Sequence, residues 1–90
     1  MISVRTEEET DHGWRYVVDV ERSGATESHT VSLSWVDHEH WCGGRQPPSR
    51  VIERLMNLLI GHGRPIPATF DAATARRWFP GIDRELAGAL

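Results

Sequence analysis

The period of the hydrophobic pattern changes once along this chain, at Ser34. Before that residue, side chains suited to a core occupy every second position in two runs, Trp14, Tyr16, Val18 and Val20 and then His29, Val31 and Leu33. Alternation of this kind is typical of β-strands with one buried and one polar face. A short link that contains Gly24 joins the two runs, and the whole stretch predicts an antiparallel hairpin. A weaker alternation at Ile2, Val4 and Thr6 suggests a further strand before it.

After Ser34 the pattern has helical spacing. Residues 34–37 read Ser-Trp-Val-Asp, which matches the capping box found at helix starts. We therefore predict a short helix from Trp35 to Cys42, ended by Gly43-Gly44. A second helix should follow Pro47-Pro48-Ser49, because an apolar stripe at helical spacing comes next, with Val51, Ile52, Leu55, Met56, Leu58 and Leu59. A third helix should begin near Asp71 and run to Phe79.

These elements predict one α+β domain over residues 1–90. We expect a small antiparallel sheet of two or three strands, arranged as a hairpin or meander and packed against two or three helices. The helix over 51–59 should cover the apolar face of the sheet. Large aromatic side chains should complete the core, namely Trp35, Trp41, Phe70, Trp78 and Phe79. Residues 1–9 and 82–90 are expected to be the most flexible parts of the chain.

The order of these signals resembles that of a group of small bacterial proteins to which no activity is assigned. The resemblance rests on the strand over 29–34, the acidic helix after it, Gly43-Gly44 and Pro48-Ser49. It also includes the later pair Phe70-Asp71 and the triplet Trp78-Phe79-Pro80. In that group a tyrosine commonly stands near the position of His38 and a leucine near that of Trp41. The resemblance implies a bacterial protein with this fold and implies no function.

The charge and the apolar content of the chain argue against general nucleic-acid binding and against a membrane-spanning protein. The chain has thirteen acidic and ten basic residues and a net charge of −3, so it has no general attraction to nucleic acid. The longest apolar run, 58–60, is too short to span a membrane. The single cysteine, Cys42, excludes an internal disulfide and fits a reducing cytoplasm. We therefore expect a cytoplasmic protein without a membrane partner.

The densest cluster of reactive side chains lies at residues 37–42. Histidine and thiolate are good zinc ligands, and His38 and Cys42 would share one face of the predicted helix. His40 would point elsewhere, so a metal site would need further ligands from His12, His29 or His62, whose spacing matches no known motif. We expect no metal and no cofactor, and keep His38, His40 and Cys42 as the ligands of an alternative zinc-binding hypothesis. No catalytic residue is assigned, because the sequence has no phosphate-binding loop, dinucleotide glycine pattern or nucleophile elbow, and we interpret the chain as a non-enzyme.

DNA binding is a further alternative. The strand-helix-helix order over 29–60 is similar to that of the ribbon-helix-helix repressors and antitoxins, which place a two-stranded ribbon in the major groove. In that hypothesis Thr30 and Ser32 would face the bases, and Arg45 and Arg50 would contact phosphates. The first helix is short for that fold, however, and the ribbon face carries no Arg, Lys, Asn or Gln. Nucleic acid is therefore not the expected partner.

A protein-interaction or accessory module is the function we favour. The other classes lack the residues they need, whereas a strand edge or the segment Trp78-Phe79-Pro80 could receive a partner. Arg76, Arg77 and Trp78 are the residues we select for such a contact. The sequence does not identify the protein partner, and a homodimer stays open.

Overall fold

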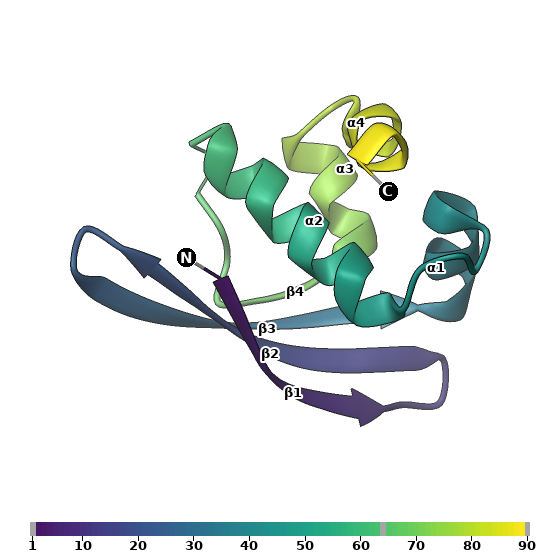
Figure 1. Ribbon diagram of the computed structural model, residues 1–90, viewed down its shortest axis with the longest axis horizontal. Helices are drawn as coiled ribbons and strands as arrows, with labels where there is room; N and C mark the ends of the chain where they lie inside the picture. Colours follow the sequence, from purple (N-terminus) through teal and green to yellow (C-terminus); the bar gives the residue numbers. More distant parts are fainter. Residues whose placement is uncertain (1, 64, 90) are drawn as a thin grey trace.

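Among the residues that the computed structural model describes, 2–63 and 65–89, four strands form one sheet and the helices cover one of its faces (Figure 1). The strands are β1 (Ile2–Glu9), β2 (Gly13–Arg22), β3 (Ala25–Ser34) and β4 (Thr69–Asp71). The helices are α1 (Trp35–Cys42), α2 (Pro48–Gly61), α3 (Ala75–Trp78) and α4 (Ile82–Ala89), with a short 3-10 turn, η1 (Ala72–Thr74), before α3. The predicted α+β class is confirmed.

The sheet has the order β1-β2-β3-β4 and is mixed. β1, β2 and β3 form the antiparallel meander that the alternating pattern predicts, and β2 and β3 pair along their full length. β4 was not predicted; it pairs in parallel with residues 30–32 of β3, so the expectation of a purely antiparallel sheet with two or three strands is corrected. A strand of three residues is too short to show an alternating pattern, and its partner strand lies far away in the sequence.

The core lies between the sheet and the helices. The strands contribute buried side chains at every second position, Tyr16, Val18, Val20, Val31 and Leu33. The predicted stripe of α2 lies against them, with Val51, Ile52, Leu55, Met56 and Leu59 buried, and α4 adds Ile82 and Leu86. The opposite face of the sheet is polar and carries the ion pairs Arg15–Glu8 and Arg5–Asp19. In the described part of the chain, no helix is both long enough and apolar enough to cross a bilayer.

The start and end of α1 follow the predicted signals. The Ser34 hydroxyl oxygen accepts a hydrogen bond from the Asp37 amide at 3.1 Å, which is half of the capping box. The Asp37 carboxylate accepts from the same hydroxyl at 2.9 Å. At the other end Gly43 has a φ of 60° and its amide donates to the Glu39 carbonyl, so a left-handed glycine terminates the helix.

The aromatic residues divide into two groups. Trp41, Phe70 and Phe79 are buried as predicted, and Trp78 is half-buried against the core. The core prediction for Trp35 is wrong, because its exposed fraction is 53%, and that of Val36 is 77%. α1 begins at the residue where β3 leaves the sheet, so its first turn has no strand beneath it, and only its last turn, with Trp41 and Cys42, reaches the core.

Candidate interaction groove

A groove of about 550 Å³ lies between the segment that leads into β4 and the end of α3. It is lined by Pro65, Ile66, Pro67, Arg77 and Trp78. The two prolines and Arg77 are exposed, whereas Ile66 and Trp78 are half-buried, so an apolar floor opens to solvent beside one cation. The groove is more than twice as large as a second pocket, of about 240 Å³, lined by Trp41, Cys42, Arg45, Gln46 and Ala87. Two of the three residues selected for partner contact, Arg77 and Trp78, therefore lie in it.

Local sequence explains the shape of both walls. The two prolines keep the 65–67 segment extended, because each fixes its own φ and restricts the residue before it. Directly after them, the Thr30 amide of β3 donates to the Ala68 carbonyl at 2.7 Å. On the other wall, the Trp78 ring meets the Phe70 ring edge-to-face, with centroids 5.1 Å apart. Both walls are thus tied to the sheet, and a ligand would find the groove already formed.

His29 holds the wall formed by residues 65–67 in place through a contact with Pro67. It lies in β3, is only 3% exposed, and its Nδ1 is 2.7 Å from the Pro67 carbonyl oxygen. A carbonyl oxygen can only accept, so Nδ1 carries the proton and donates it. Nε2 lies 3.4 Å from a Glu27 carboxylate oxygen, within ion-pair distance, but without the geometry of a hydrogen bond. His29 is therefore a positioning residue for the groove, a role that the sequence did not indicate.

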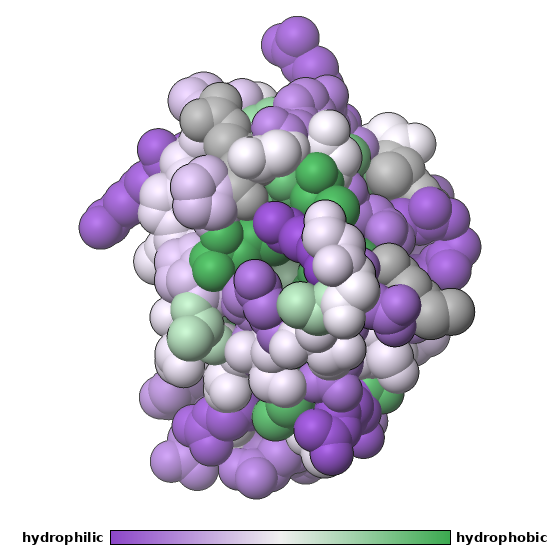
Figure 2. Space-filling view, turned by 90° about the vertical axis from the view of Figure 1, so that its left-hand side faces the viewer, coloured by the Kyte–Doolittle hydropathy of each residue, from purple (hydrophilic) through white to green (hydrophobic). Residues whose placement is uncertain are grey.

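The face of the molecule shown in Figure 2 carries hydrophobic side chains near its centre, ringed by hydrophilic ones. This end of the molecule holds the start of β1, the end of α2 and the segment that continues into the groove (Figure 1). Ile2, Ile60 and Ile66 are all partly buried hydrophobic residues of these segments. Ile66 thus belongs both to the apolar floor of the groove and to the partly buried residues that pack against the core.

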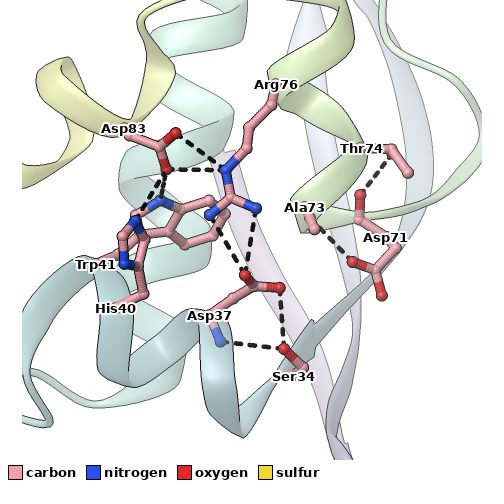
Figure 3. A network of polar contacts seen from close by, with 9 residues as sticks. All are labelled: Ser34, Asp37, His40, Trp41, Asp71, Ala73, Thr74, Arg76 and Asp83. Carbon is pink, nitrogen blue, oxygen red and sulfur yellow. Dashed lines mark hydrogen bonds and ion pairs between the residues drawn. The ribbon is translucent and has the colours of Figure 1, made fainter.

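The adjacent arginine, Arg76, has a different environment and belongs to a polar network between α1, α3 and α4 (Figure 3). Its guanidinium donates to both carboxylate oxygens of Asp83, at 2.9 and 3.0 Å, and to Asp37 at 3.3 Å. It also lies over the ring of Trp41, 4.9 Å from the centroid, and the Trp41 indole N–H donates to Asp83. His40 completes the group, 3.6 Å from the same Asp83 carboxylate.

These contacts shift the ionisation of the two central groups. Burial by itself would raise the pKa of Asp83, but hydrogen bonds from Trp41 and Arg76 and the nearby positive charge bring that pKa below its usual range. Burial lowers the pKa of Arg76, but the carboxylates of Asp83 and Asp37 raise it by more, so the pKa lies above its usual value. The charge of Arg76 is therefore already paired within the chain, where it links α3 to α1 and α4. Arg77, one residue later, is exposed and has no ion pair within the described residues, which leaves its charge available to a partner.

The three candidate zinc ligands, His38, His40 and Cys42, do not point toward a common site. The Nε2 of His38 lies 2.6 Å from the Gln46 carbonyl oxygen, and the His38 ring packs edge-on against Trp14. Cys42 is buried, and its thiol donates to the His38 carbonyl at 3.2 Å. His40 points to Asp83 on the other side of α1 (Figure 3). Within residues 2–63 and 65–89, no group of three His, Cys, Asp or Glu side chains is placed to hold a metal ion.

The nucleic-acid candidates are spread over separate places. Thr30 and Ser32 lie on the polar face of the sheet, where the Ser32 hydroxyl donates to Asp71 at 3.0 Å. Arg45 lines the second pocket, and Arg50 pairs with Glu53 on α2. β3 is hydrogen-bonded to β2 on one edge and to β4 on the other, so a ribbon shared between two copies would first have to displace a strand.

Comparison with known proteins gives no relative for this chain: no family model, no curated protein and no solved structure matches it. Among the described residues, the groove offers an apolar surface, the half-buried indole of Trp78 and the exposed cation of Arg77.

Proposed function

We propose that this chain is a non-enzymatic protein-interaction module, and that its docking site is the groove lined by residues 65–67, Arg77 and Trp78. The observation that carries the proposal is the combination of apolar walls and one exposed arginine in a preformed groove. Such a surface favours a ligand with an apolar side chain and a carboxylate close together, because the apolar part is desolvated while the carboxylate pairs with the guanidinium.

The same lining favours binding over catalysis. Among the described residues that line the groove, the ionisable side chain is the Arg77 guanidinium, which stays protonated at physiological pH and does not act as a general acid or base. An open groove with one proline-containing wall also suits an extended polypeptide segment better than a small molecule, which is usually enclosed on most sides. We further propose that the protein is cytoplasmic, because its single cysteine is buried and forms no disulfide. A bacterial origin is proposed on the sequence resemblance alone.

Peptide display tests this proposal directly. A library of random peptides is selected on the immobilised wild-type chain, and the enriched peptides are measured against Arg77→Glu and against Arg84→Glu, a matched change of an exposed arginine on α4. Enriched peptides should combine acidic with aromatic or aliphatic residues. They should bind Arg77→Glu at least about tenfold more weakly, since an ion pair becomes a repulsion, and should bind Arg84→Glu as well as the wild type.

Two results would contradict the proposal. One is a selection without enrichment over an uncoated surface. The other is a set of enriched peptides that bind both variants equally well, because their contact would then lie outside the groove. Circular dichroism of both variants controls for loss of fold.

A further inference from the structure

The first turn of α1 presents an apolar surface that has no cover in the chain. Trp35 is 53% exposed and Val36 is 77% exposed. Glu39 is also exposed and lies four residues after Trp35 and three after Val36. At these spacings the three side chains are neighbours on the same helix surface. We call Trp35, Val36 and Glu39 the α1 cluster.

The surroundings of the α1 cluster are acidic. The Trp35 amide donates to the His12 carbonyl at 2.9 Å, which brings the β1–β2 turn, with the exposed Asp11, next to the cluster. Asp11 and Glu39 have no ion pair within the described residues. Their charges are therefore available, and the cluster combines two apolar side chains with the free carboxylate of Glu39, close to that of Asp11.

This is the chemistry that the groove selects. The α1 cluster offers an indole, an aliphatic side chain and one carboxylate, and the groove offers an apolar floor beside the free cation Arg77. An open groove of about 550 Å³ has room for an indole ring. The two surfaces are thus complementary in both hydrophobicity and charge.

Both surfaces also lie on neighbouring elements. The Asp37 carboxylate of α1 contacts the Arg76 guanidinium of α3 at 3.3 Å, and these residues adjoin Val36 and Arg77 in the sequence. Two copies can therefore make the same contact twice, each giving its α1 cluster and receiving that of the other, as a closed two-fold dimer requires.

We infer that the partner of the groove is a second copy of this chain. The α1 cluster of each copy packs against Ile66 and Trp78 of the other, with Glu39 facing Arg77, about a two-fold axis. This inference rests on the docking role proposed for the groove and adds the identity of the ligand.

Sedimentation equilibrium over micromolar to near-millimolar concentrations tests the inference. The wild-type mass should approach twice the 10.2 kDa of the chain. Val36→Arg on one surface and Arg77→Glu on the other should each raise the dimer dissociation constant at least about tenfold, because the first brings a second cation against Arg77 and the apolar floor, and the second sets a carboxylate against Glu39. Arg84→Glu should leave it unchanged. Adding Glu39→Arg to Arg77→Glu reverses the charge pair and should restore most of the affinity.

The outcomes separate this inference from the proposed function. Loss of the dimer in both single variants and its recovery in the double variant support it. A dimer that is indifferent to Val36→Arg and Arg77→Glu overturns it, since another surface then makes the contact. A monomer at every concentration also overturns it, and the peptide selection then decides the rest: binding that depends on Arg77 retains the groove as a docking site for another protein, and its absence removes both proposals.

Discussion

Replacement of Trp41 by alanine is the sharpest test of how α1 is held. Trp41 is 3% exposed, its ring lies under the Arg76 guanidinium, and its indole N–H donates to Asp83. Truncation of a buried tryptophan of this kind costs roughly 3–5 kcal/mol in cavity formation and lost burial. The lost hydrogen bond adds little, because the Asp83 side chain is 44% exposed and water can take the place of the indole.

Trp35→Ala is the matched control, since it removes the same side chain from the same helix. About half of Trp35 stays in water in the folded chain, so its loss should cost less than about 1.5 kcal/mol. Urea denaturation at low micromolar concentration, where a weak dimer has dissociated, measures both free energies of unfolding. A loss below about 1 kcal/mol for Trp41→Ala, or an equal loss for the two variants, would refute this description of α1 packing.

Further predictions concern the network and the groove. Arg76→Met should lower the free energy of unfolding by roughly 1–3 kcal/mol in urea, because it leaves a largely buried carboxylate on α1 without its cation, whereas Arg84→Met should change it by less than about 0.5 kcal/mol. Because the pKa of Asp83 is depressed in the folded chain, its carboxylate stabilises the fold above the unfolded value of about 3.9, and this contribution is lost as the pH falls through the lower folded value. Asp83→Asn should therefore lose less stability than the wild type between neutral pH and about pH 3, and equal losses in urea titrations would argue against the assignment. His29→Ala should speed hydrogen exchange of the Thr30 amide, because that amide donates to the Ala68 carbonyl beside the segment that His29 anchors at Pro67, while the exposed His12→Ala should leave this exchange unchanged. A chelator should not alter the unfolding midpoint of the wild type, and a decrease would revive the zinc hypothesis.

Much of the fold could be predicted because its signals are local. The alternation in β2 and β3, the capping box at Ser34 and the glycine that ends α1 each involve residues within a few positions of one another. β4 could not be predicted in this way, since its three residues form a strand only through pairing with a distant part of β3. Trp35 was misplaced for a related reason: periodicity indicates the face of a helix, but not how far the sheet extends beneath it.

The groove was only partly predictable. Arg76, Arg77 and Trp78 stood out in the sequence together, but only the rotation of α3 against α1 and α4 decides that Arg76 is enclosed by carboxylates and that Arg77 is free. The opposite wall, residues 65–67, comes from a segment to which the sequence gave no role. The anchoring of this wall by His29 joins residues 38 positions apart, and no local pattern reports such a contact.

The parallel pairing of β4 has a consequence for the order of folding. β1, β2 and β3 close short turns and can pair early, whereas β4 is separated from β3 by α1 and α2, so the entropy of a long loop must be overcome before the two strands pair. One wall of the groove is the run that enters β4, and the other rests on Phe70 within it. We therefore expect the binding surface to assemble in the last step of folding, so that a partially folded chain exposes its hairpins but cannot yet recognise a partner.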